Sequence, residues 1–200
     1  MTSILQSLSK TVHLSLGLAL LLFLGLHFFG DGFAFDTIFW SWLFRFIHVA
    51  VAIMWIGLLW YFDFIQVPNM PKIPNEQKPA IQNIIAPAAL FYLRWAAFFT
   101  ILSGLILALL NGYLQDAMTL SIKSGIAKHS AIGIGMWLGV IMAFNVWFII
   151  WPNQKRALGI IDCEMDIKMK SERTAMLFSR VNTLLSIPML FTIVTAQNLY

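Results

Sequence analysis

Two histidines stand inside apolar stretches, where an ionisable group is costly. His48 lies in the run FRFIHVAVAIMWIG, three residues after Arg45, and His129 opens the run HSAIGIGMWLG. A neutral imidazole is a suitable axial ligand for a haem iron, and helical bundles hold cofactors between facing helices. These residue types make His48 and His129 candidate axial ligands of a haem b. They make Arg45 a candidate partner for a haem propionate.

Helical periodicity places small residues beside both candidate ligands. His48 shares a helix face with Ala52 and Trp55, and His129 shares one with Gly133. A flat macrocycle held by a histidine needs such clearance, so Ala52 and Gly133 are candidate cofactor-binding residues, and Trp55 is a third candidate because it shares the His48 face. A second interpretation stays open, in which each histidine only hydrogen-bonds to a neighbouring helix and the arginine snorkels to the membrane interface.

Four polar residues form a second candidate cluster at the other end of the same helices. Asp63 closes one apolar run and Arg94 opens the next, and Asn145 and Asn182 fall at a similar depth. Because the first two would lie on antiparallel neighbours, we expect them to form an ion pair. The two amides are expected to satisfy each other. Both pairs are interpreted as structural locks of the bundle.

Composition places the chain in the membrane class. Of the 200 residues, 60% are hydrophobic and 11% are charged, with a mean hydropathy of +0.79. A soluble domain carries roughly a quarter charged residues. The single cysteine, Cys163, excludes an intrachain disulfide and a CxxCH haem attachment site. The sequence has no phosphate loop, no nucleophile elbow and no basic cluster interleaved with aromatics, so we expect no nucleic-acid partner.

Apolar runs of about 20 residues predict an all-α integral membrane protein with five transmembrane helices. The second to fifth form a four-helix bundle, the first packs outside it, and residues 1–200 make a single transmembrane domain. The first run follows Lys10 as a signal peptide would, but without a small-residue cleavage site we expect a retained helix. The predicted spans are about 11–29, 41–66, 90–111, 127–151 and 181–197.

The loops between these spans predict the orientation. Residues 67–88 hold five prolines and are not expected to form a regular helix throughout, and residues 153–180 read as a charged connector. Lysine and arginine concentrate in these two loops, which predicts a cytoplasmic N-terminus and an outer C-terminus. This topology places His27, His48 and His129 in the outer half of the bilayer and leaves His13 at the inner end.

Three segments of the chain resemble the membrane domain of the bacterial cytochrome-c-linked urate oxidase (urate hydroxylase) family. They are RFIHVAVAIMWIGLLWYF, HSAIGIGMWLGVIMAFNVWFIIWPNQKR and SRVNTLLSIPMLFTIV, within residues 41–197. The first is the least specific, because similar helices occur in copper-resistance membrane proteins and in a bacterial protoporphyrinogen oxidase. The given chain holds no cytochrome c segment and is similar to the short, stand-alone members. The family-pattern positions are Arg45, His48, Trp55, His129, Asn145, Pro152, Asn153, Gln154, Asn182 and Pro188.

The resemblance implies a redox protein in the bacterial inner membrane. It would bind one haem b near the outer face through His48 and His129 and exchange electrons with a periplasmic cytochrome c or the quinone pool. Oxidation of a small molecule such as a purine is the enzymatic activity it implies, and whether this chain is itself an oxidoreductase stays open. The alternative is a cofactor-free multi-pass subunit in transport, assembly or scaffolding.

Overall fold

The structure is a computed structural model that describes residues 2–30, 32 and 34–200. Within these residues all regular structure is helical and no strand occurs. The chain divides into two compact units, Met1–Trp40 and Ser41–Tyr200, and each is described here by itself. The all-helical prediction is confirmed for the described residues.

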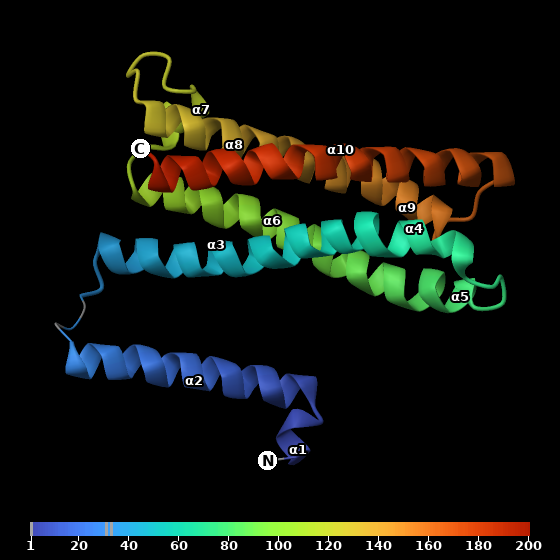
Figure 1. The fold of residues 1–200 in the computed structure, drawn as a ribbon, viewed down its shortest axis with the longest axis horizontal. Coiled ribbons are helices and arrows are strands. Elements are labelled where there is room, and N and C mark those ends of the chain that lie inside the picture. The colour runs from blue at the N-terminus through green and yellow to red at the C-terminus, as the bar shows by residue number, and fades with distance from the viewer. Residues whose placement is uncertain (1, 31, 33) are drawn as a thin grey trace. The chain divides into compact units, whose positions relative to one another are not determined.

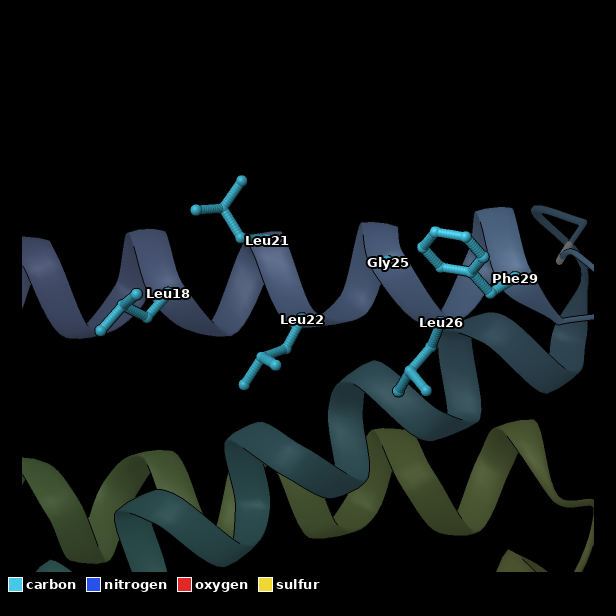
Figure 2. Close-up of a pocket in the computed structure, with 6 residues that line it drawn as sticks. All are labelled: Leu18, Leu21, Leu22, Gly25, Leu26 and Phe29. Atoms are coloured by element: carbon cyan, nitrogen blue, oxygen red, sulfur yellow. The ribbon is translucent and has the colours of Figure 1, made fainter.

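The first unit consists of two helices and the start of a third. α1 spans Thr2–Leu5 and α2 spans Leu8–Phe29. A pocket on α2 is lined by apolar residues of this one helix, and Figure 2 shows them: Leu18, Leu21, Leu22, Gly25, Leu26 and Phe29. A surface of hydrocarbon alone offers no group for binding or catalysis, and it suits contact with lipid.

α3 spans Thr37–Trp60 and begins in the first unit at a capped end. The carboxylate Oδ1 of Asp36 accepts hydrogen bonds from the backbone amides of Ile38 and Phe39, at 2.9 and 3.0 Å. Such a side chain satisfies amides that have no partner inside the helix. The remaining helical segments are η1 (Tyr61–Gln66), α4 (Val67–Asn69), η2 (Met70–Lys72), α5 (Lys78–Ala80), η3 (Ile81–Ile85), α6 (Ala86–Leu110), α7 (Leu114–Met118), α8 (Ala127–Phe144), η4 (Asn145–Ile150), α9 (Trp151–Ala157) and α10 (Met165–Asn198).

Several of these segments join into longer helices. In the described part of the chain, five helices are long and apolar enough to cross a membrane. Each predicted span lies within one of them, except that the third extends one residue beyond Leu110, and four of the five helices are clearly longer than predicted. They run over Leu8–Phe29, Thr37–Lys72, Lys78–Leu110, Ala127–Ala157 and Met165–Asn198.

Part of the extra length arises because the helices continue through prolines. The π-helical segments η1, η3 and η4 each end two residues before a proline, which is Pro68, Pro87 or Pro152. Proline lacks an amide hydrogen and its ring clashes with the carbonyl four residues earlier. A wider π turn accommodates this clash without ending the helix. The prediction that residues 67–88 are not a regular helix throughout is therefore confirmed, but most of the segment is helical and the break is confined to residues 73–77.

The prediction that residues 153–180 form a loop between spans is wrong in part. α9 continues to Ala157, and α10 begins at Met165, so most of the charged run is helical. With 34 residues, α10 is about 51 Å long and exceeds the roughly 30 Å of a bilayer core. The helix is therefore longer than a bilayer core requires, and its charged residues are concentrated in its first turns.

In the second unit, α3, α6, α8 and α10 lie side by side around one buried core (Figure 1). Trp55 and Leu59 of α3, Ala97 of α6, and Met142 of α8 are almost fully buried in it. At one end, called the histidine end, α3 and α8 begin and α6 and α10 end. At the other, called the charged end, residues 67–88 and 152–170 connect the helices.

A pair of buried amides joins α10 to the α8–η4 helix within this core. Asn145 Nδ2 donates to Asn182 Oδ1 at 2.8 Å, and Asn182 Nδ2 donates to the carbonyl of Met142 at 2.9 Å. Asn182 is fully buried. The expected mutual satisfaction of the two amides is present, and it fixes the register between the helices because a shift would leave buried polar groups unpaired.

Candidate functional site

His48 is held by α6 through one ring nitrogen. Its Nδ1 lies 3.0 Å from the carbonyl oxygen of Thr100 and 3.2 Å from Oγ of Ser103. Since a carbonyl oxygen only accepts, Nδ1 must carry the proton. Ser103 Oγ donates to the carbonyl of Phe99, so it too accepts from His48. In neutral His48, Nε2 therefore keeps its lone pair for another partner.

The position of this ring depends on Gly104. A Cβ built on Gly104 would lie 3.0 Å from Cε1 and 3.3 Å from Nδ1 of His48. Relaxed carbon–carbon contacts are about 3.5–4.0 Å. The missing side chain of Gly104 therefore leaves the notch in α6 into which the imidazole fits.

His129 has the same arrangement with a different acceptor. Its Nδ1 lies 3.0 Å from Oδ2 of Asp116. The ring of Tyr113 faces it, with centroids 5.6 Å apart and planes 30° apart. The carboxylate accepts the Nδ1 proton, which again leaves Nε2 as the available nitrogen of a neutral ring.

The loop that carries Tyr113 and Asp116 is bound tightly to α8. Ser130 Oγ donates to the carbonyl of Leu120 at 3.0 Å, and Trp137 Nε1 donates to the carbonyl of Met118 at 3.1 Å. Gly133 belongs to this contact, since a Cβ there would collide with the carbonyl oxygen of Ala117. The backbone of α7 therefore fills the space beside Gly133 that was predicted to be left for a macrocycle. The predicted role of Gly133 in cofactor binding is corrected accordingly.

Tyr113 lies beside His129 of α8 and within the electrostatic influence of Arg45 on α3. Burial raises the pKa of Tyr113, and the positive charge of nearby Arg45 partly opposes this effect. Arg45 is exposed at the histidine end, three residues before His48. Tyr113 and Asp116 therefore contact His129, and Arg45 lies close enough to act on Tyr113 through its charge.

Trp55 lies on the His48 face of α3, toward the charged end. Its side chain is 1% exposed, and its Nε1 has no hydrogen-bond partner in the described part of the chain. A buried N–H without an acceptor costs about 1–3 kcal/mol. Ala52, between His48 and Trp55, is half-buried. The predicted face is thus continuous, and one of its members carries an unsatisfied donor.

The predicted ion pair between Asp63 and Arg94 is wrong. Asp63 accepts hydrogen bonds from the hydroxyls of Ser179 and Thr183, both on α10. Arg94 instead lies on the aromatic ring of Trp151, with its Cζ 3.3 Å from the ring centroid. The two helices place the side chains at a comparable depth but turn them toward different neighbours.

Three features of the site are absent from the sequence prediction. Tyr113 and Asp116 come from a short loop segment, GYLQD, and Gly104 lies inside an apolar helix. The other two histidines belong to the first unit, where His13 Nδ1 lies 2.6 Å from the carbonyl of Ser9 and His27 contacts Phe28. The sequence signal that could have identified Tyr113 and Asp116 is that these two polar residues stand three apart in the segment before the His129 helix.

The fold and the site define an all-helical protein with five helices of membrane-spanning length and two histidines with available nitrogens in its second unit. Residues 121–198 match a protein-family model described as urate oxidase N-terminal. The matched stretch takes in α8, η4, α9 and α10, and over it the chain is similar to urate-oxidase-related proteins. No curated protein and no solved structure matches the chain.

Proposed function

We propose that the chain is a five-span membrane redox protein that binds one haem b through Nε2 of His48 and Nε2 of His129. One observation carries this proposal: both histidines donate Nδ1–H to an acceptor on a neighbouring segment. Histidines that bind metals nearly always donate the other ring N–H to a carboxylate or a backbone carbonyl, which fixes the tautomer and the ring orientation. The donor set of the site therefore suits a haem iron.

Each neighbouring residue has a defined role in this proposal. The Thr100 carbonyl and the Asp116 carboxylate orient the rings and raise their basicity. Gly104 leaves room for the ring of His48, and exposed Arg45 is placed to pair with a propionate. A haem bound here would supply one-electron redox chemistry.

The family match supports a more specific assignment. The similarity of residues 121–198 to urate oxidase N-terminal proteins favours a role linked to the oxidation of a purine such as urate. The excess of lysine and arginine at the charged end favours a cytoplasmic position for that end in a bacterial inner membrane. The histidine end would then face a periplasmic cytochrome c or exchange electrons with the quinone pool.

A cofactor-free subunit is the competing function, and it too has an observation in its favour. His48 uses Nδ1 to join α3 to α6, which is a sufficient structural role for an intramembrane histidine. The two functions differ in what they require of Nε2. Only the haem protein needs that nitrogen on both histidines.

Absorption spectra of four purified proteins test the proposal. Wild type, His48→Ala, His129→Ala and His13→Ala are compared, with His13 as a matched control because it is an exposed histidine in the first unit. We expect haem in the wild type and in His13→Ala, and its loss or altered reduced bands in the other two. Haem bound unchanged in both His48→Ala and His129→Ala would overturn the ligand assignment.

A further inference from the structure

Arg94 is a buried cation without a counter-ion at the charged end of the second unit. It is 9% exposed, and its Nε and Nη1 are enclosed and have no hydrogen-bond partner within the described chain. Among the described residues, no carboxylate lies within ion-pair distance of Arg94. An enclosed, unpaired guanidinium is expensive and points to a missing anionic partner.

The surroundings of Arg94 attract cations but supply no acceptor. Its Cζ lies 3.3 Å from the ring centroid of Trp151 and 5.9 Å from that of Trp147. Lys155 brings a second cation to the same Trp151 ring, with Nζ 5.6 Å from the centroid. An aromatic face attracts a cation through its quadrupole, yet one ring does not neutralise two full charges.

The backbone holds this arrangement in place. Trp147 Nε1 donates to the carbonyl oxygen of Arg94 at 3.2 Å, which ties α6 to η4. From that level the Arg94 side chain reaches Trp151, one helical turn nearer the charged end. The guanidinium is therefore positioned by two tryptophans and does not extend freely into solvent.

The level of the cluster suggests which anion is available. Trp151 and Lys155 lie one turn apart where η4 passes into α9, next to Arg156. Tryptophan and lysine at the end of a membrane span lie at the level of the lipid headgroups. A phosphate at that level would accept charge-assisted hydrogen bonds from a guanidinium and from an ammonium group.

We propose that Arg94 and Lys155, with Trp151 as a platform, bind the phosphate group of an anionic phospholipid at the charged end. This inference rests on the membrane placement in the proposed function and not on the haem. The shared chemistry is a phosphate oxyanion, which a free phosphate ion would also supply.

Lipid binding by the purified full chain tests the proposal. The protein is placed in nanodiscs of phosphatidylcholine with increasing phosphatidylglycerol, and thermal stability and lipids retained in native mass spectrometry are measured. A parallel arm adds inorganic phosphate to discs of phosphatidylcholine alone. We expect wild type to be stabilised by phosphatidylglycerol and to retain it, with no effect of inorganic phosphate.

Matched variants locate the site. Arg94→Gln should weaken retention of phosphatidylglycerol by about tenfold or more, because it removes charge-assisted hydrogen bonds. Lys155→Gln should weaken it by about two- to fivefold, as expected for a more exposed cation. Arg173→Gln, at an exposed arginine of α10, is the control and should change nothing.

Three results would overturn the inference. They are equal stability of wild type in the two lipids, unchanged retention in both Arg94→Gln and Lys155→Gln, and an equal stabilisation by inorganic phosphate, which would assign the site to a free ion. If Arg94→Gln does not fold, the comparison of wild type with Lys155→Gln still tests whether the site binds phosphatidylglycerol. Haem absorbance in the same samples separates a failure of the redox proposal from a failure at this site.

Discussion

The contact between Gly104 and His48 gives the sharpest mutational prediction. A Cβ in Gly104→Ala would lie 3.0 Å from Cε1 of His48, so the ring must move by about 0.5–1 Å to restore a normal contact. Such a shift lengthens the 3.0 Å hydrogen bond to Thr100 beyond good geometry. We expect about 1 kcal/mol from the lost hydrogen bond and about 1–3 kcal/mol from overpacking.

Helix propensity works in the opposite direction and can be controlled. Alanine gains about 1 kcal/mol over glycine inside a helix, which leaves Gly104→Ala about 1–3 kcal/mol less stable than wild type. Gly57, at an exposed position of α3, has nothing within 4 Å of a Cβ built on it. Gly57→Ala therefore receives the propensity gain without the clash and should be up to about 1 kcal/mol more stable.

Unfolding in mixed micelles, followed by circular dichroism, measures this difference. The free energies of unfolding of the two glycine variants should differ by about 2–4 kcal/mol, and Gly104→Ala alone should alter the spectrum of any bound haem. Equal stability of Gly104→Ala and Gly57→Ala, with identical spectra, would refute the placement of His48 in the notch.

Three further predictions concern the rest of the second unit. Asp116→Ala should weaken haem affinity about 10–100-fold in a haem titration, because His129 loses the acceptor that orients it; an unchanged affinity would count against the site. Burial raises the pKa of Tyr113, so the folded state holds this proton more tightly than the unfolded chain. Its contribution to stability is complete below about pH 10 and is lost as pH rises through the folded-state pKa; alkaline unfolding of Tyr113→Phe should lack this component, and identical profiles would contradict it. Asn182→Ala should cost about 1–3 kcal/mol in the free energy of unfolding, since it leaves the buried Asn145 amide unpaired, and the double change to alanine should recover part of the loss. Additive losses in the double variant would argue against the pair.

The sequence predicts the helices well because apolar runs and helix formation share one cause. It underestimates their length at the prolines, where a local rule against regular helix competes with the continuity of a long apolar element. Pro68 and Pro152 are accommodated by π turns, and neither the width of a turn nor its position follows from composition.

The sequence predicts the depth of a residue along a helix better than the direction in which it points. His48, His129, Asn145 and Asn182 are identified correctly as buried or half-buried polar positions on membrane-length helices. The pairing of Asp63 with Arg94 fails because it needs the relative rotation of two helices, which one sequence does not supply.

Contacts made by loops and small residues are the other part that sequence analysis misses. Gly133 was expected to leave room for a cofactor, but the backbone at Ala117 occupies that space. The acceptor for His129 comes from Asp116 in α7, a short helix in the connection between α6 and α8, and the position of this connection depends on hydrogen bonds to α8. Such contacts depend on tertiary packing and have no periodic signal in the chain.

The central claim is that the second unit holds a haem between His48 and His129, and an absorption spectrum of the wild-type protein tests it most directly. The full chain is purified in detergent from haem-replete cells, recorded oxidised and dithionite-reduced, and assayed as the pyridine haemochrome. The account predicts a Soret band, sharp reduced α and β bands, and about one haem b per chain. A colourless protein from such cells would contradict it and would favour the cofactor-free subunit.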